Sequence, residues 1–359
     1  MNRFYPLTVE SVRPETRDAV VVTLAAAPEH AERFRYAAGQ HLNVRVAIDG
    51  QEVRRSYSIC ASEGERALRV AIKRVPGGLF SNWANDRLRA GDTIEAMPPD
   101  GHFGLSPAPG ARRRYLAVAA GSGITPVLSV ARTALEREPD GEVMLVYGNR
   151  SSSTAMFRDA IADLKDTYPT RLSVVHVLSR EQQDIELFNG RIDRERCDAL
   201  FSSWIDVDGL DAAYVCGPLP MMRAVADALA ARGVEPQRVR MEVFATSAER
   251  GVRPAVHTVV GADACTVTVV QDGTTRSFEM PKTGASLLDA ALEHGIELPY
   301  SCKAGVCSTC RCRLTEGEVD LDANFALEDY EIARGVRLAC QSYPVTDRVT
   351  IDFDQDQGA

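Results

Sequence analysis

The feature that most constrains how this chain can fold is a group of cysteines near its C-terminal end. Cys302, Cys307 and Cys310 are separated by four and then two residues, and Cys340 follows after 29 more. The N-terminus lacks the apolar run of a secretory signal, so we expect a cytoplasmic protein whose thiols stay reduced. Clustered thiols in a reducing compartment predict a metal or iron–sulfur site, for which the fold must bring Cys340 to the other three.

The spacing of these cysteines is typical of a plant-type [2Fe–2S] cluster, which takes two thiolates on each iron. Small residues between them (Ala304, Gly305 and Ser308) allow backbone N–H groups to approach the sulfurs. A zinc site is the alternative, but zinc ligands usually come in two close pairs. The predicted cluster ligands are Cys302, Cys307, Cys310 and Cys340. The remaining cysteines, Cys312 among them, are expected to be small buried side chains, apart from Cys216.

Ahead of these cysteines, the hydrophobic pattern changes character. Short β-rich runs separated by glycines predict a small β-barrel over about the first 105 residues. These runs lie at 20–24, 41–46, 56–59 and 68–72. From about residue 110, apolar strands alternate with helical segments, which predicts a parallel sheet of βαβ units. The expected strands lie at 115–119, 143–147, 172–177, 213–216 and 238–244.

The C-terminal part is expected to be a third domain. Asp272-Gly273 between two β-rich runs predicts a hairpin, and Ser286 is expected to cap a helix that Gly295 ends. The predicted fold class is multidomain, with a β-barrel, an α/β parallel-sheet domain and an α+β domain. The expected boundaries are 1–107 for the barrel, 108–245 for the α/β domain, 246–262 for a linker and 263–359 for the last domain.

Charge and hydropathy exclude two classes of partner. The net charge is −9, from 41 basic and 50 acidic residues, and a nucleic-acid-binding protein needs a basic face. The longest uncharged stretch, 115–131, contains several glycines and a proline and is short for a bilayer span. We therefore expect neither a nucleic-acid partner nor a membrane. An acidic stretch around 316–322, continued by Glu328, Asp329 and Glu331, is either a docking face for a basic partner or a solvated surface.

Two segments of the predicted barrel suit a flavin dinucleotide. Strand alternation puts Arg55 and Tyr57 on one face, where arginine pairs with pyrophosphate and tyrosine covers a flavin ring. Gly77-Gly78-Leu79-Phe80-Ser81 then offers glycines for close backbone approach and a helix N-terminus for a phosphate. The alternatives are an exposed arginine beside a core tyrosine, and an ordinary glycine turn with a capping serine.

Glycine turns also follow three strands of the predicted parallel sheet. Gly121-Ser122-Gly123-Ile124-Thr125-Pro126 stands between a strand and a helix, Tyr147-Gly148-Asn149-Arg150 follows the next strand, and Cys216-Gly217-Pro218 a later one. Ligands bind at the carboxyl ends of such strands, so three turns there predict a nucleotide crevice, although each alone is an ordinary tight turn. Ser179, Arg180 and Arg191 follow a further strand, where arginine reads the 2′-phosphate of NADP; solvated arginines are the alternative.

Taken in order, these motifs are similar to those of the ferredoxin–NADP reductase superfamily, in members with a plant-type ferredoxin at the C-terminus. The similarity spans essentially the whole chain. The segments that carry it are RRSYSIC, AAGSGITP, YGNR, FRDAIADLKDTYP, GRID and LPYSCKAGVCSTCRC. The resemblance implies an FAD-binding β-barrel, an NAD(P)-binding α/β domain and a β-grasp [2Fe–2S] ferredoxin domain.

The resemblance also implies roles for individual residues. The positions matched to FAD are Arg55, Tyr57, Ser58, Ile72, Lys73, Gly78, Phe80 and Ser81. Those matched to the nicotinamide nucleotide are Gly121, Gly123, Thr125, Pro126, Asn149, Arg150, Ser179, Arg180, Arg191, Cys216, Gly217 and Pro218. Thr125 is expected beside the flavin and Cys216 beside the nicotinamide, which makes them the two candidate catalytic positions.

Within the superfamily the chain resembles the reductase subunits of phenylacetyl-CoA epoxidases and, in architecture, the reductases of ketosteroid hydroxylases. This resemblance implies that electrons pass from NADPH, with NADH left open, through FAD and the [2Fe–2S] cluster to an oxygenase component. The implied oxygenase is a di-iron phenylacetyl-CoA epoxidase of phenylacetate degradation. The alternatives are a reductase for another hydroxylase, acting on steroids or aromatic rings, and a non-catalytic redox sensor.

Overall fold

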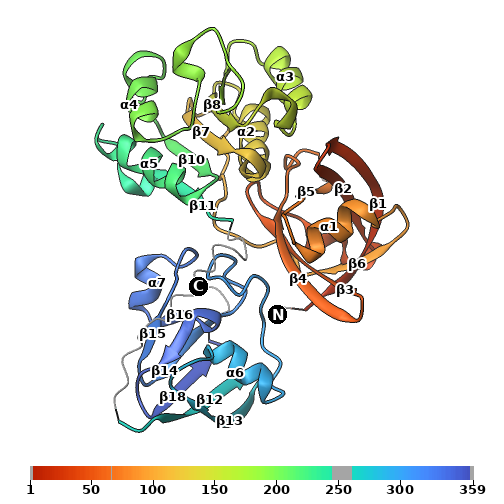
Figure 1. The fold of residues 1–359 in the computed structure, drawn as a ribbon, viewed down its shortest axis with the longest axis vertical. Helices are drawn as coiled ribbons and strands as arrows, with labels where there is room; N and C mark the ends of the chain where they lie inside the picture. The colour runs from red at the N-terminus through yellow and green to blue at the C-terminus, as the bar shows by residue number, and fades with distance from the viewer. Residues whose placement is uncertain (1–2, 66, 245–260, 356–359) are drawn as a thin grey trace. The chain divides into compact units, whose positions relative to one another are not determined.

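The computed structural model describes residues 3–65, 67–244 and 261–355. The chain divides into two compact units, residues 4–244 and residues 245–359 together with 1–3 (Figure 1). Each unit is described by itself. Of the predicted linker 246–262, only Gly261 and Ala262 lie within the described residues.

The first part of the larger unit is the predicted β-barrel. Its six antiparallel strands run in the order β4-β3-β6-β1-β2-β5. They are β1 (Tyr5–Thr16), β2 (Ala19–Ala26), β3 (His41–Ile48), β4 (Gln51–Ser58), β5 (Leu68–Lys73) and β6 (Thr93–Ala96). Beyond β4, Ile59 pairs with Val70 and the Cys60 N–H donates to the Arg69 carbonyl at 2.9 Å, so the two edge strands meet. A short helix η1 (Pro28–Phe34) and helix α1 (Leu79–Asp86) lie between strands.

Sequence periodicity located four of the six barrel strands. β1 alternates strictly at its start, where Tyr5, Leu7 and Val9 are buried and the residues between them exposed. This period of two makes one face of the strand part of the barrel core, because successive side chains point to opposite faces. We did not expect β1 or β6, since β1 mixes charged residues and Pro14 into its second half and β6 has only four residues.

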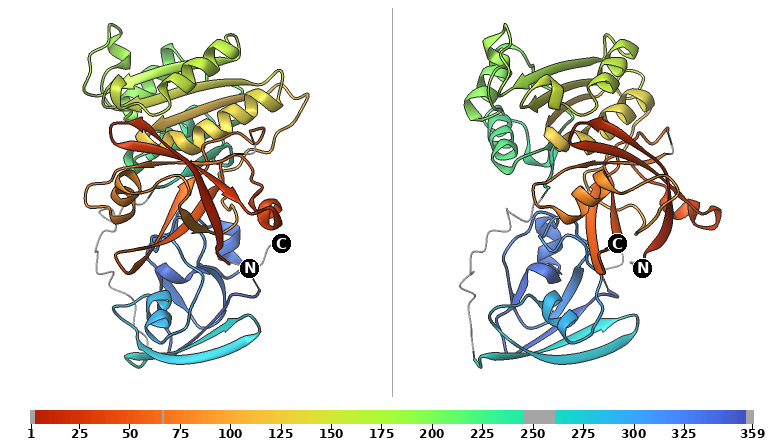
Figure 2. Two further views of the ribbon diagram at one scale, coloured as in Figure 1. Left: turned by 90° about the vertical axis from the view of Figure 1, so that its right-hand side faces the viewer. Right: turned by 45° about the vertical axis from the view of Figure 1, so that its right-hand side comes forward.

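The second part of the larger unit, coloured yellow to green in Figure 2, is the predicted parallel sheet. Its strands run in the order β11-β10-β7-β8-β9. The strands are β7 (Arg114–Ala120), β8 (Glu142–Asn149), β9 (Leu172–Leu178), β10 (Ala212–Cys216) and β11 (Val239–Glu242). The helices are α2 (Ile124–Arg137), α3 (Arg158–Thr167), α4 (Arg194–Ser203) and α5 (Leu219–Ala230), with short turns η2 (Gly121–Gly123), η3 (Ser152–Thr154), η4 (Glu186–Phe188) and η5 (Pro236–Arg238). Ala117 of β7 packs with α2 and α3 in one core, and Val118 packs with α4 and α5 in another, so helices cover both faces.

The smaller unit has a five-stranded mixed sheet in the order β13-β12-β18-β14-β16, with β12 and β18 parallel. The strands of that sheet are β12 (Ala264–Gln271), β13 (Thr274–Pro281), β14 (Arg311–Glu316), β16 (Val336–Leu338) and β18 (Arg348–Asp352). A separate two-stranded sheet pairs β15 (Val319–Leu321) with β17 (Ser342–Pro344). The helices of the smaller unit are α6 (Leu287–Glu293), α7 (Asp329–Ala333) and η6 (Ala339–Gln341).

Local signals in the smaller unit are confirmed. Asp272 and Gly273 both have positive φ, as the two-residue turn between β12 and β13 requires. The Ser286 hydroxyl accepts a hydrogen bond from the Asp289 N–H at 3.2 Å and so caps α6. Gly295, with φ of 71°, follows the end of that helix.

Candidate functional site

The strand β4 presents the first candidate flavin residues. Tyr57 lies against Phe80 of α1, with ring centroids 5.4 Å apart and planes inclined at 37°. Burial raises the pKa of Tyr57, whereas the neighbouring Arg55 lowers it. The Arg55 side chain donates to the Arg54 carbonyl at 2.7 Å. An aromatic side chain and a cation on one strand fit the ring and the pyrophosphate of a flavin dinucleotide.

The turn between β5 and α1 is closed by Ser81. Its hydroxyl accepts from the Val75 N–H at 3.1 Å, and it donates to the Gly78 carbonyl at 3.3 Å. A Cβ on Gly78 would lie 2.7 Å from this hydroxyl oxygen, so the turn requires glycine there. Helix α1 begins at Leu79, so Ser81 is the third residue of the helix. The residue that precedes the helix, where a capping serine would stand, is Gly78. The first N–H groups of α1 have no partner within the helix, which fits a phosphate group. Ile72 and Lys73 end β5 beside this turn, and Lys73 lies 3.8 Å from Asp18.

The structure brings two of the three glycine turns into direct contact. A Cβ on Gly123 would lie 2.2 Å from the Cys216 carbonyl oxygen and 3.0 Å from the Gly217 nitrogen. The Tyr147 hydroxyl donates to the Gly121 carbonyl at 3.0 Å, which ties β8 to the same turn. Helix α2 begins at Ile124, two residues ahead of the expected Pro126, because the η2 turn leads directly into it. These carboxyl ends therefore form one edge, where nucleotides bind in such sheets.

The two candidate catalytic positions, Thr125 and Cys216, are both buried. Thr125 is buried and its hydroxyl donates to the Ser122 carbonyl at 3.0 Å. Cys216 is fully buried, and burial together with the nearby Glu242 raises the pKa of its thiol well above the ordinary value. A thiol of raised pKa is a poor nucleophile, so its chemistry here is that of a small apolar side chain.

Glu242 is a site residue that the sequence reasoning missed. It ends β11, and its carboxylate accepts a hydrogen bond from the Ser58 hydroxyl, at the end of β4, at 2.8 Å. The residue keeps some exposed surface, but the second carboxylate oxygen is buried and has no hydrogen-bond partner among the described residues. Burial raises the pKa of Glu242 from 4.5 to about 7. A carboxyl group at the junction of flavin and nucleotide motifs can therefore hold a proton near neutral pH.

We expect this buried acid to make stability depend on pH. Below pH 4.5 the Glu242 carboxyl is protonated in both the folded and the unfolded chain, so its raised pKa does not affect stability there. As the pH rises from 4.5 through 7, the unfolded chain loses this proton more readily than the folded chain, and the free energy of unfolding falls. The full difference is about 3 kcal/mol. Glu242→Gln should therefore match the wild type near pH 4.5 and be more stable above pH 7, by several degrees in thermal melts.

Thermal denaturation followed by circular dichroism from pH 4.5 to 8.5 measures this difference. Glu235→Gln is the matched control, because Glu235 is exposed and its carboxylate forms an ion pair with Arg238 at 3.2 Å. Parallel curves for the wild type and Glu242→Gln would contradict the assignment.

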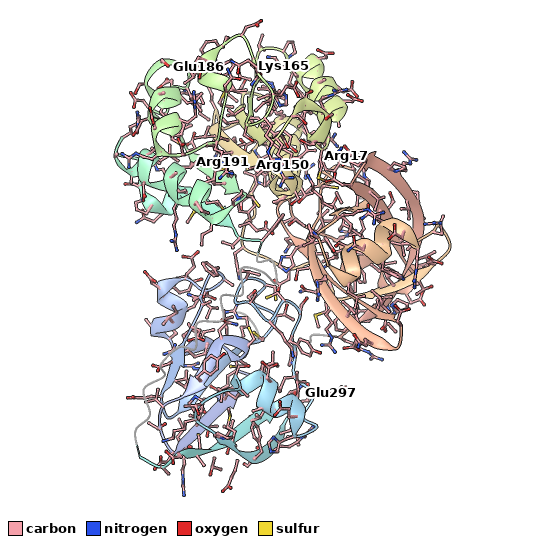
Figure 3. The ribbon with its side chains drawn as sticks, in the orientation of Figure 1. Arg17, Arg150, Lys165, Glu186, Arg191 and Glu297 are labelled. Atoms are coloured by element: carbon pink, nitrogen blue, oxygen red, sulfur yellow. The ribbon has the colours of Figure 1, made fainter. Side chains whose placement is uncertain are left out.

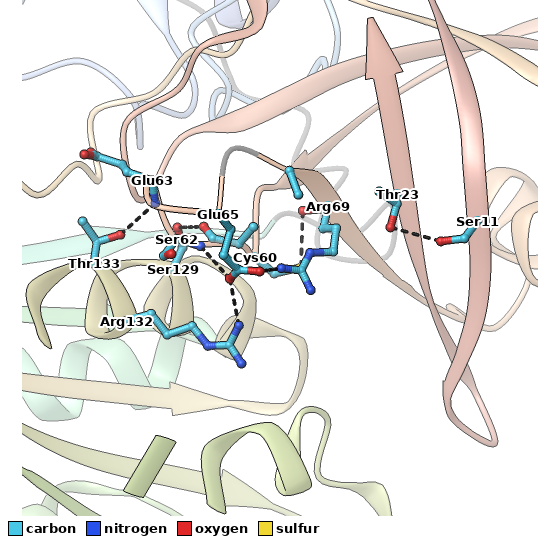
Figure 4. Close-up of polar contacts among 12 residues, drawn as sticks. Ser11, Thr23, Cys60, Ser62, Glu63, Glu65, Arg69, Ser129, Arg132 and Thr133 are labelled. Atoms are coloured by element: carbon cyan, nitrogen blue, oxygen red, sulfur yellow. Dashed lines mark hydrogen bonds and ion pairs between the residues drawn. The ribbon is translucent and has the colours of Figure 1, made fainter. Parts of the chain in front are cut away.

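Polar contacts fix the barrel against the parallel sheet within the larger unit (Figure 4). The Ser129 hydroxyl on α2 donates to the Ala61 carbonyl at 2.7 Å, and the Glu63 N–H donates to the Thr133 hydroxyl at 3.2 Å. The Arg132 guanidinium lies 3.0 Å from the Glu65 carboxylate. These contacts hold helix α2, and with it the Gly121–Gly123 turn, in a set position relative to β4, the strand that carries the candidate flavin residues.

Arginines gather where β8 and β9 end. The Ser179 N–H donates to the Asn149 carbonyl at 2.9 Å, and the Arg180 N–H donates to the Arg150 carbonyl at 2.8 Å. The Gly190 N–H donates to the Leu178 carbonyl at 2.8 Å, which brings Arg191 to the end of β9 (Arg150 and Arg191 are labelled in Figure 3). Within the described part of the chain, the side chains of Arg150, Arg180 and Arg191 make no hydrogen bond or ion pair. Their charge is available to an anionic ligand.

The cysteine loop lies in the smaller unit. Lys303, Gly305 and Ser308 have positive φ, and a Cβ on Gly305 would lie 2.5 Å from the Ala323 carbonyl oxygen. The Ala339 N–H donates to the Cys310 carbonyl at 3.0 Å, which brings η6 and its Cys340 to the loop. The fold therefore supplies the long-range contact that the spacing requires.

The four thiols form two pairs. Cys302 hydrogen-bonds to Cys307, and Cys310 to Cys340. No three His, Cys, Asp or Glu side chains of the described residues converge as ligands of a single ion. Two thiols for each of two irons is the arrangement that a [2Fe–2S] cluster needs.

Hydrogen-bond donors surround these sulfurs. The Ala304 N–H lies 3.3 Å from the Cys302 sulfur, and the Thr309 hydroxyl lies 3.2 Å from the Cys307 sulfur. The Cys307 thiol and backbone N–H groups lower the pKa of Cys302 to about 6. Because iron binds the thiolate, these donors fit a cluster site. Cys312 is buried outside the two pairs and donates to the Arg337 carbonyl at 3.7 Å.

Three known families match successive parts of the chain. Residues 6–104 match the oxidoreductase FAD-binding domain, residues 117–227 the oxidoreductase NAD-binding domain and residues 269–345 the 2Fe-2S iron-sulfur cluster binding domain. In the described residues, no helix is both long enough and apolar enough to cross a bilayer.

Relatives match over most or all of the chain. One subunit of the 1,2-phenylacetyl-CoA epoxidase of Escherichia coli K12 is 45% identical over 354 residues, 99% of each chain. The ferredoxin reductase component of a 3-ketosteroid-9-alpha-monooxygenase from Mycobacterium tuberculosis is 37% identical over 90% of this chain and 87% of its own. Among solved structures, phthalate dioxygenase reductase is 25% identical, covers 98% of both chains and has a TM-score of 0.60.

Proposed function

Because the chain belongs to the family of reductase components that join an FAD-binding, an NAD-binding and a [2Fe–2S] domain, we propose that it drives an oxygenase with electrons from NADPH. The proposed partner is a di-iron phenylacetyl-CoA epoxidase, in keeping with the name of the Escherichia coli relative. We place the protein in the cytoplasm, where thiols remain reduced. The proposed domains are 1–107, 108–245 and 263–359, with a linker at 246–262.

One contact carries the proposal for the larger unit. The hydrogen bond from Ser58 to Glu242 joins the end of β4, which carries the candidate flavin residues, to the end of β11, at the edge of the parallel sheet where the glycine turns lie. A nicotinamide and a flavin held by these two motifs would therefore be close to each other. When bound, FAD accepts the two electrons of a hydride and the cluster carries electrons singly, which suits an oxygenase.

The residues of the chain supply binding and orientation. We propose that FAD is held by Arg55, Tyr57 and Ser58, by the end of β5 and by the Gly78 to Ser81 turn. We propose that the nicotinamide nucleotide is held by the Gly121–Gly123 turn and the Cys216-Gly217-Pro218 turn, with Pro126 and Asn149 beside them. The two thiol pairs are proposed to hold the cluster.

Partner identity is tested by reconstitution. The purified protein, loaded with FAD and cluster, is mixed with a di-iron phenylacetyl-CoA epoxidase component, and NADPH oxidation is followed with and without phenylacetyl-CoA. We expect oxidation coupled to substrate. A second candidate partner is a steroid hydroxylase, favoured by the 37% identity to the Mycobacterium tuberculosis relative. Coupling to that oxygenase and not to the epoxidase would establish the second candidate, and no turnover with ferricyanide would contradict both.

We propose NADPH as the preferred donor because three arginines at the ends of β8 and β9 lack partners among the described residues. Arg180→Ala is expected to raise the KM for NADPH by about tenfold, since a lost charge-assisted contact to phosphate is worth about 1.5–3 kcal/mol. The KM for NADH should change little. Steady-state kinetics with both nucleotides measure the ratio. Arg194→Ala is the control, because Arg194 is paired with Asp198 at 2.8 Å. Equal effects on NADPH and NADH would contradict the role in 2′-phosphate binding.

A further inference from the structure

The carboxylate of Glu181 is held by a serine and not by an arginine. One of its oxygens accepts the Ser152 N–H at 2.8 Å and the Ser152 hydroxyl at 3.0 Å. Ser152 begins the η3 turn beyond β8, and Glu181 lies beyond β9. The contact therefore links the two loops that carry the candidate phosphate-binding arginines.

The position of this carboxylate is set by the backbone. The Arg180 N–H donates to the Arg150 carbonyl at 2.8 Å, so these two residues lie side by side. Glu181 follows Arg180 directly, and Ser152 lies two residues beyond Arg150. Glu181 is thus an acidic residue that the chain places directly beside Arg180.

An exposed acid that lies beside exposed arginines can form an ion pair with them. Asp198 illustrates this on α4, where it pairs with both Arg194 and Arg232 at 2.8 Å. Glu181 forms no ion pair, and Arg150, Arg180 and Arg191 have no side-chain partner either, within the ranges that the structure describes. Instead, the Glu181 carboxylate accepts its two hydrogen bonds from Ser152.

We propose that Ser152 is a specificity-determining residue, because it holds the Glu181 carboxylate away from the arginines and leaves them free to bind a phosphate dianion. This inference rests on the proposed preference for NADPH, whose 2′-phosphate is that dianion. Ser152→Ala removes the hydroxyl donor and leaves the backbone N–H, so the carboxylate is held by one hydrogen bond in place of two and can turn to form an ion pair with the arginine group. The ligand phosphate then competes with an internal anion.

The experiment uses the full-length protein with its cofactors and two probes, 2′,5′-ADP and 5′-AMP, which differ by the 2′-phosphate alone. Isothermal titration calorimetry gives the Kd of each. Ser152→Ala is expected to weaken 2′,5′-ADP by up to about fivefold, the most that an ion pair between exposed side chains contributes, and to leave 5′-AMP within about twofold. Ser152→Thr keeps both donors and should bind as the wild type does. Ser153→Ala is the neighbouring control.

The double variant Ser152→Ala/Glu181→Gln separates this role from a general loss of structure. Removal of the carboxylate charge should restore 2′,5′-ADP binding to within about twofold of the wild type, since the Glu181 charge no longer competes for the arginines. Binding as weak as in Ser152→Ala would overturn the inference, as would an unchanged ratio of the two Kd values in the single variant. If the wild type itself binds both probes equally, the NADPH preference fails, and this inference falls with it, whereas the electron-transfer function stands on its other tests.

Discussion

Replacement of Cys340 by serine is expected to remove the electron paramagnetic resonance signal of the [2Fe–2S] cluster and to reduce NADPH-driven cytochrome c reduction by about 100-fold or more. Changes around a metal site that spare its ligands already cost about 10–100-fold, and this change removes a ligand. Cys340 pairs with Cys310 and lies on η6, held to the cysteine loop by the Ala339 N–H. Ferricyanide reduction should persist, because ferricyanide accepts electrons from a flavin directly.

The matched control is Cys312→Ser, which makes the same change at a buried thiol of the same unit. Its Sγ donates to the Arg337 carbonyl, a contact that a serine hydroxyl can keep. We expect this variant to retain the signal and the cytochrome c activity. A full signal in Cys340→Ser, or its loss in Cys312→Ser alone, would show that the ligand set has been assigned wrongly.

Replacement of Gly123 by alanine is expected to slow flavin reduction by NADPH by about 100-fold, because a misplacement of about 1 Å in a positioning element has that effect. The added Cβ would lie 2.2 Å from the Cys216 carbonyl oxygen. Neither backbone can move without shifting β7 or β10, and both strands carry a proposed nucleotide turn. Anaerobic stopped-flow absorbance of the flavin band measures the rate.

Ser122→Ala is the control for this substitution, since it removes an oxygen from the same turn and adds no atom. FAD content and the cluster signal after dithionite reduction show whether each variant is folded. A Gly123→Ala protein that is loaded with both cofactors and is reduced at the wild-type rate would contradict the close contact of the two turns.

Local patterns allowed much of the fold to be predicted. The strands at 68–72 and 172–177 were located to within a residue or two, because buried strands carry apolar runs bounded by turn residues. Helix α4 was missed, since it is rich in charged residues and only Cys197, Leu200 and Phe201 are buried. The acidic stretch was interpreted wrongly at one position. Glu331 is buried and pairs with Arg311 at 2.6 Å, so it does not belong to a docking face.

The sequence by itself determined the motifs whose chemistry is set by neighbours in the chain. Cysteine spacing specifies a loop that carries three thiols, and glycines between a strand and a helix specify turns that leave N–H groups open. Such features depend on a few consecutive residues. They can therefore be recognised without knowledge of the packing.

Only the tertiary structure decided which of these motifs meet and what surrounds them. The carboxyl of Glu242 meets Ser58 across 184 residues, and its raised pKa follows from burial that no local pattern predicts. The contact of Glu181 with Ser152 and the approach of Gly123 to Cys216 likewise join separate strands of one sheet. Charge states and close contacts depend on distances between residues far apart in the chain, and those distances are set by the packing of the whole unit.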